Sequence, residues 1–108
     1  MSYWISLVEP DRKHHEIDWD GVHCSWNYSD MLSALPCGYE RDWQGKQAED
    51  MIKPIEDSLT ALKNNPEDYE KYEVDPDHDC GTIEGCQYIL RTCLEGFKQY
   101  PKGIIILD

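Results

Sequence analysis

Two stretches of this chain repeat apolar residues at steps of three and four, and this spacing constrains the fold more than any other feature. The first stretch covers residues 47–62 and the second covers residues 82–100. Residues with that spacing share one side of an α-helix, so each stretch predicts an amphipathic helix that buries its apolar side against another element. Pro54 lies inside the first stretch and lacks a backbone N–H. This helix therefore either kinks at Pro54 or has a first turn that ends at Lys53.

The strands are predicted from runs of aromatic and β-branched residues. Residues 3–8 (YWISLV) predict a first strand, residues 14–19 a weaker second one, and residues 22–28 a third with one buried side. The wholly apolar run IIIL at 104–107 fits a C-terminal strand. These elements predict a single α+β domain over residues 1–108, in which a small N-terminal antiparallel β-meander packs against two main helices.

Large aromatic rings are the first candidates for the core of so small a domain. We expect Trp4 and Trp26 to be buried. Trp43 and Tyr39 lie in a segment with glycine and proline over residues 36–45, and we expect both to be partly exposed. An exposed ring among acidic residues suits the anchor of a basic protein partner.

The chain is strongly acidic, with 22 Asp and Glu residues against 10 Lys and Arg residues and a formal net charge of -12. Carboxylates repel phosphate, so this charge argues against direct binding to nucleic acid or anionic lipid. No apolar run approaches the roughly 18 residues that a membrane-spanning helix needs. The opening residues lack the basic start and long apolar stretch of a signal peptide, so we expect a cytoplasmic protein.

The residues that bind metals or perform catalysis show no recognisable spacing. The five cysteines are odd in number and are expected to be thiols rather than a disulfide framework. No CxxC motif is present, and the calcium-loop start at 75–79 is followed by Cys80 and Cys86 where Gly and Glu are needed. We therefore expect no metal, no cofactor and no enzymatic activity. The residue types that bind zinc occur at His14, His15, His23, Cys24, Cys37, His78 and Cys80, without the paired spacing of a structural zinc site.

Several stretches form an ordered series along most of the chain. They are SYWISLVEP at 2–10, SWNYS at 25–29, WQGKQAEDMIKPIEDSLTAL at 43–62, GTIEGCQYIL at 81–90 and FKQYP at 97–101. In this series the chain resembles a group of small uncharacterised proteins encoded by phages and prophages. Residues 10–24 and 30–42, and the cysteines, lie outside the resemblance. The group has no established activity, so the resemblance implies a phage or prophage origin and transfers no catalytic residue.

The leading hypothesis is a non-enzymatic interaction protein that binds a basic host protein and antagonises it, with a DNA mimic as one specific form. A small body of charge -12 is steered toward basic clefts. Residues 67–79 hold seven acidic residues and one lysine, and we expect the contact surface there. The residues expected to contact the partner are Glu67, Asp68, Glu70, Glu73, Trp43 and Tyr39.

The alternative is a small-molecule- or metal-binding protein with a site near His23, Asn27 and Tyr28. His23 and Asn27 share the polar side of the predicted third strand, and a pocket over that side would present them together. If that side is open and flat, this hypothesis fails. A homodimer is compatible with either hypothesis.

Overall fold

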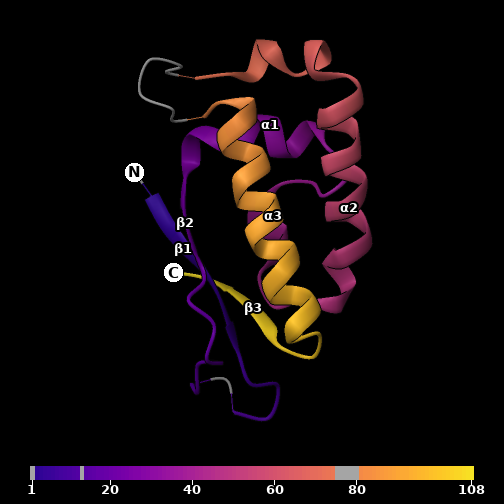
Figure 1. Cartoon of the computed structure of the whole chain (residues 1–108). Coiled ribbons are helices and arrows are strands. Elements are labelled where there is room, and N and C mark those ends of the chain that lie inside the picture. Colours follow the sequence, from indigo (N-terminus) through magenta and orange to yellow (C-terminus); the bar gives the residue numbers. More distant parts are fainter. Residues whose placement is uncertain (1, 13, 75–80) are drawn as a thin grey trace.

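Three strands form one antiparallel sheet with the first strand at its centre. The computed structural model describes residues 2–12, 14–74 and 81–108. The strands are β1 (Ser2–Val8), β2 (Val22–Ser25) and β3 (Ile104–Leu107), in the order β2-β1-β3 (Figure 1). Residues 2–5 of β1 pair with β2, and residues 5–8 pair with β3. The predicted C-terminal strand is confirmed, and it completes a sheet that the N-terminal strand begins.

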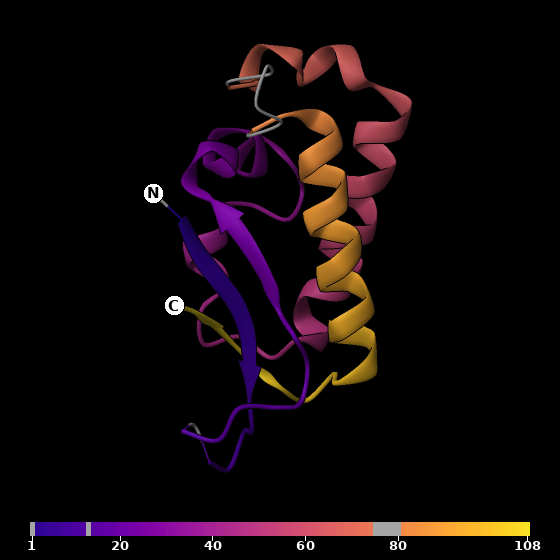
Figure 2. The same cartoon turned by 60° about the vertical axis from the view of Figure 1, so that its left-hand side comes forward.

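Two long helices, α2 (Glu49–Asn64) and α3 (Ile83–Gln99), lie side by side against one face of this sheet (Figures 1 and 2). The α+β class, with N-terminal strands packed against helices, is therefore confirmed. α2 runs through Pro54 as one helix and does not end a first turn at Lys53. The shorter elements are η1 (Trp26–Tyr28), α1 (Ser29–Ala34), η2 (Glu40–Trp43), η3 (Pro66–Asp68) and η4 (Glu70–Tyr72).

The predicted second strand of the meander, over residues 14–19, is wrong. Within the described part of that segment, only an isolated bridge joins Glu16 to Val8. The Trp19 N–H donates to the Ile17 carbonyl 2.7 Å away, and a turn this tight ends strand pairing. The sheet is instead completed by β3, which pairs with β1 on the side opposite β2 and whose Ile105 side chain is fully buried.

The third strand is shorter than predicted and ends at Ser25. The Ser25 side chain accepts a hydrogen bond from the Asn27 N–H at 3.1 Å and caps the turn of η1. A side chain that bonds the backbone in this way competes with the sheet ladder. Residues 26–28 therefore form a 3₁₀ turn rather than strand.

The core lies between the sheet and the two helices. Tyr3, Ile5 and Leu7 of β1 point inward and meet the buried stripe of α3. That stripe consists of Cys86, Ile89, Leu90, Cys93, Gly96 and Phe97. The Thr82 side chain caps α3 by accepting a hydrogen bond from the Gly85 N–H at 3.0 Å.

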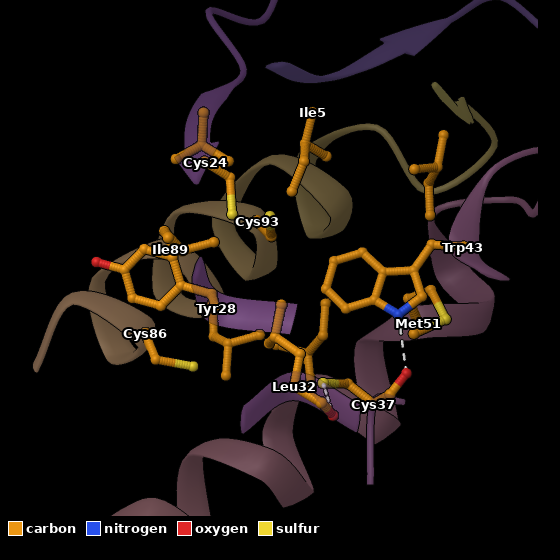
Figure 3. Packing of buried hydrophobic residues seen from close by; sticks show 14 of the residues in the cluster. Ile5, Cys24, Tyr28, Leu32, Cys37, Trp43, Met51, Cys86, Ile89 and Cys93 are labelled. Atoms are coloured by element: carbon orange, nitrogen blue, oxygen red, sulfur yellow. Dashed lines mark hydrogen bonds between the residues drawn. The ribbon is translucent and has the colours of Figure 1, made fainter. Parts of the chain in front are cut away.

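Trp4 and Trp43 occupy the opposite environments from those expected. Trp4 is 50 % exposed, whereas Trp43 is 1 % exposed and packs inside the core (Figure 3). In β1 the alternate residues Tyr3 and Ile5 face the helices, so Trp4 faces outward. The Trp43 indole N–H donates to the Cys37 carbonyl at 2.8 Å, which satisfies its one polar group inside the core. Trp26 is half-buried, with its ring centre 4.0 Å from that of Tyr3.

Two glycines of α3 let aromatic rings approach the helix closely. A Cβ atom at Gly96 would lie 2.2 Å from the Trp19 ring. A Cβ atom at Gly85 would lie 2.1 Å from the Tyr28 hydroxyl oxygen. Glycine therefore occupies these positions because of packing between segments far apart in the sequence.

Candidate functional site

The outer face of the sheet carries a stacked aromatic pair. Trp4 lies opposite His23 in the β1–β2 register, and their ring centres are 5.0 Å apart at an interplanar angle of 28°. Trp4 exchanges both backbone hydrogen bonds with Asp108, at 3.2 and 2.9 Å. Its N–H and C=O groups therefore point away from β2, and Trp4 and His23 form a non-hydrogen-bonded pair, the kind whose side chains lie closest. His23 also makes a 2.8 Å hydrogen bond with the Ser2 hydroxyl.

A hollow of about 330 Å³ adjoins this pair. We call it the aromatic hollow, and its lining residues are Trp4, Asp20, Gly21, Val22, His23 and Tyr88. Tyr88 comes from α3 and is 61 % exposed. Gly21 has a φ of +71°, and a Cβ atom there would lie 2.5 Å from the Ile5 carbonyl oxygen, so the floor requires glycine. The hollow thus combines two exposed rings, a histidine and one carboxylate, with no Lys or Arg among its lining residues.

The hollow contains functional candidates that the sequence hypotheses missed. The signal for Trp4 was available, because it alternates with Ser2 and Ser6 while Tyr3 and Ile5 form the apolar side of the strand. Tyr88 likewise lies off the buried stripe of α3. The proximity of these two rings had no local signal, since it depends on strand register and helix packing.

The predicted acidic contact residues lie at the end of the molecule that η3 and η4 form, above the ends of α2 and α3 in Figure 1. Glu67, Asp68 and Glu70 are exposed, and no ion pair joins them to another residue in the described ranges. We call these three residues the acidic end. Glu73 is half-buried and accepts a 3.0 Å hydrogen bond from the Ile83 N–H, so it helps to cap α3. Residues 75–80, which include the rejected calcium-loop start and the zinc candidates His78 and Cys80, lie outside the described residues.

The acidic residues of α2 differ from those of the acidic end, because lysines pair with them. Lys53 lies 2.8 Å from Asp57. Lys98 and Lys102 lie 3.2 Å from Glu56 and 3.0 Å from Glu49. The acidic end therefore has more carboxylates without an ion-pair partner than this helix has, within the described residues.

The two aromatic residues predicted to contact a partner have different positions. Tyr39 is half-buried, which confirms the expected partial exposure. The expected exposure of Trp43 is wrong, since its ring is enclosed by the core. Trp43 therefore stabilises the fold and is not available as a surface anchor.

The three residues of the alternative site, His23, Asn27 and Tyr28, lie in different environments. His23 and Asn27 are exposed, whereas Tyr28 is buried and its hydroxyl lies against Gly85 of α3. His23 instead lines the aromatic hollow, without Asn27 or Tyr28.

A second polar group, around Glu40, is enclosed by the core. The Glu40 side chain is 0 % exposed, and its Oε2 accepts hydrogen bonds from the Tyr3 hydroxyl and, at 3.1 Å, from the Ser29 hydroxyl. The Tyr3 hydroxyl also lies 3.0 Å from the Cys24 sulfur. Burial, followed by the nearby Cys24 and Glu40 groups, raises the pKa of Tyr3 far above its usual value, so this hydroxyl stays protonated. Glu40, Tyr3 and Cys24 are buried, and their contacts join η2 to β1 and β2, which is a structural role.

The described cysteines are not poised as nucleophiles. Cys37, Cys86 and Cys93 are free thiols in the core, and Cys24 is buried as well. Burial raises the pKa of Cys37 to about 11, and burial also raises the pKa values of Cys86 and Cys93 well above the usual value of a thiol. Nucleophilic attack needs the thiolate, which these environments disfavour. Among the residues that the structure describes, no cluster of three or more His, Cys, Asp or Glu residues is arranged to hold a metal ion.

No protein-family model, no curated protein and no solved structure matches this chain. Within the described ranges, no helix has both the length and the apolar character needed to cross a membrane. The site must therefore be interpreted from its own residues.

Proposed function

We propose that this protein is a non-enzymatic interaction module that binds a basic protein of a bacterial host and antagonises it in the host cytoplasm. The acidic end carries the proposal, because its three exposed carboxylates have no ion-pair partner in the described part of the chain. Unpaired surface charges of one sign attract a partner of the other sign and raise its association rate. The net charge of -12 gives the whole molecule a negative electrostatic field that attracts the same kind of partner. In the specific case of DNA mimicry, this protein would occupy the cleft in which its partner binds nucleic acid.

Charge reversal at the acidic end tests this function. The protein is immobilised, exposed to a bacterial lysate and eluted with a salt gradient, and the captured proteins are identified by mass spectrometry. We expect basic proteins that elute as salt rises, and we expect their loss in the triple variant Glu67→Lys, Asp68→Lys, Glu70→Lys. Glu73 is left unchanged because its carboxylate caps α3.

A matched triple variant, Asp11→Lys, Glu16→Lys, Glu95→Lys, changes the net charge equally at exposed positions elsewhere. This control should retain its captured proteins. If both triples lose capture to the same extent, only net charge matters and the acidic end is not the contact surface. If neither loses it, the proposed electrostatic capture is wrong.

A second candidate function is the binding of a small molecule beside His23. The volume of the aromatic hollow, about 330 Å³, lies at the lower limit of small-molecule pockets, about 300–1,000 Å³. Native mass spectrometry of the purified protein decides this alternative. A mass excess that disappears in His23→Ala would favour it, and a bare mass would exclude a tightly bound ligand.

A further inference from the structure

The aromatic hollow exposes rings that a domain of this size would ordinarily bury. Trp4 is 50 % exposed and Tyr88 is 61 % exposed, and both line the same hollow. Exposed aromatic rings grouped in a concave site are typical of contacts in which a partner inserts a side chain. The hollow shares no lining residue with the acidic end, so the two features can be considered separately.

The chemistry of the lining residues selects a cation. Asp20 supplies an exposed carboxylate, and the lining has no Lys or Arg. The faces of Trp and Tyr rings attract Lys and Arg side chains through the ring quadrupole. The surrounding net charge of -12 acts in the same direction.

Among the residues that the structure describes, no strand pairs with the outer edge of β2, which borders the hollow. β2 is an outer strand of the sheet, with β1 on its inner side. Because Trp4 directs its backbone groups toward Asp108, the N–H and C=O groups of His23 point outward from β1. An extended peptide can pair with such an edge. A residue placed opposite His23 would have its side chain on the outer face of the sheet, beside the rings of His23 and Trp4.

We propose that the edge of β2 and the aromatic hollow bind an extended basic segment of the partner protein, with one Lys or Arg side chain over Trp4 and Tyr88 near Asp20. This inference rests on the proposed function and adds a second contact to it. A second copy of this chain is a poorer occupant, because it carries the same net charge and its β2 edge (VHCS) has neither Lys nor Arg. Charge complementarity therefore favours a basic partner over a homodimer.

Titration with a synthetic peptide tests the inference. The probe is a capped peptide of about seven residues that alternates Thr and Lys, roughly the length of one strand, and its controls carry Glu or norleucine in place of Lys. We expect ¹⁵N NMR shifts at the Trp4 indole N–H and at the amides of Gly21 and His23 with the lysine peptide. Equal binding of the norleucine or glutamate peptide would overturn the requirement for a cation.

Single variants measure the contribution of the hollow. Trp4→Ala and Tyr88→Ala should each weaken binding roughly 2- to 30-fold, the range of one cation–π contact, while Trp4→Phe should retain part of the affinity. Asp20→Asn should weaken binding more than Asp68→Asn, which removes the same charge at the acidic end. All these residues are exposed, and circular dichroism verifies that the variants fold.

The outcomes separate this inference from the proposed function. Shifts confined to the acidic end, or an affinity unchanged by Trp4→Ala and Tyr88→Ala, would overturn the inference and leave capture of a basic partner intact. If the lysine peptide does not bind while the protein still captures basic proteins from the lysate, the inference is likewise overturned and the proposed function remains. Self-association that disappears in Trp4→Ala would overturn the inference in favour of a homodimer through this face.

Discussion

Replacing Trp43 with alanine should destabilise the protein severely, although the sequence predicts that this residue is partly exposed. Its ring is 1 % exposed, and its N–H donates to the Cys37 carbonyl at 2.8 Å. Truncation of a buried Trp costs about 3–5 kcal/mol through lost burial and the remaining cavity. Leaving the Cys37 carbonyl unpaired costs about 1–3 kcal/mol more. We expect a combined loss of about 4–6 kcal/mol, because the two contributions overlap.

That loss is comparable with the whole stability of a small domain, about 5–15 kcal/mol. With a urea dependence of about 2 kcal/mol per molar, the unfolding midpoint should fall by about 2–3 M. Far-UV circular dichroism is the appropriate assay, since removal of an indole alters the fluorescence signal itself. Trp43→Phe keeps a buried ring and removes the N–H, so it should lose less, about 1–3 kcal/mol.

Trp4→Ala is the matched control for this prediction. Its ring is half exposed and stacks mainly on His23, so the free energy of unfolding should change by less than about 1 kcal/mol. Equal midpoint shifts for Trp43→Ala and Trp4→Ala would refute the assignment of Trp43 to the core and Trp4 to the surface. The pair also separates stability from binding, because only the Trp4 variant should remain folded while losing the contact at the hollow.

Two further predictions concern packing and pH. Gly96→Ala should lower the free energy of unfolding by about 1–3 kcal/mol, because the new Cβ would lie 2.2 Å from the Trp19 ring. Glu95→Ala, on the exposed side of α3, is the control and should be nearly neutral. Thermal unfolding measures both variants, and an unchanged melting temperature for Gly96→Ala would contradict this account. Stability should also fall as pH rises from about 9 to 11, by about 1.4 kcal/mol per pH unit for Cys37 alone, because the unfolded thiol releases its proton at lower pH than the folded one. Urea midpoints across that pH range measure the slope, and an identical slope in Cys37→Ala would show that this thiol is not a source of it.

The sequence by itself determined the elements whose signal is local. The three- and four-residue spacing predicted α2 and α3, and the cap formed by Thr82 was readable from its position before the apolar stripe. The apolar run IIIL likewise predicted β3. Each of these patterns consists of residues close together in the chain, so it can be recognised without the tertiary structure. The accumulated charge of -12 was likewise a property of composition alone.

The tertiary structure decided which side of each element is buried and which distant residues meet. Trp43 belongs to the short turn η2, where no periodicity marks a buried side, and its burial follows from the packing of that turn into the core. The aromatic hollow joins Trp4, His23 and Tyr88 through the β1–β2 register and the packing of α3. The buried Glu40 accepts hydrogen bonds at Oε2 from Tyr3 and Ser29, which belong to other segments. Such contacts arise between residues far apart in the chain, where a single sequence carries no local signal.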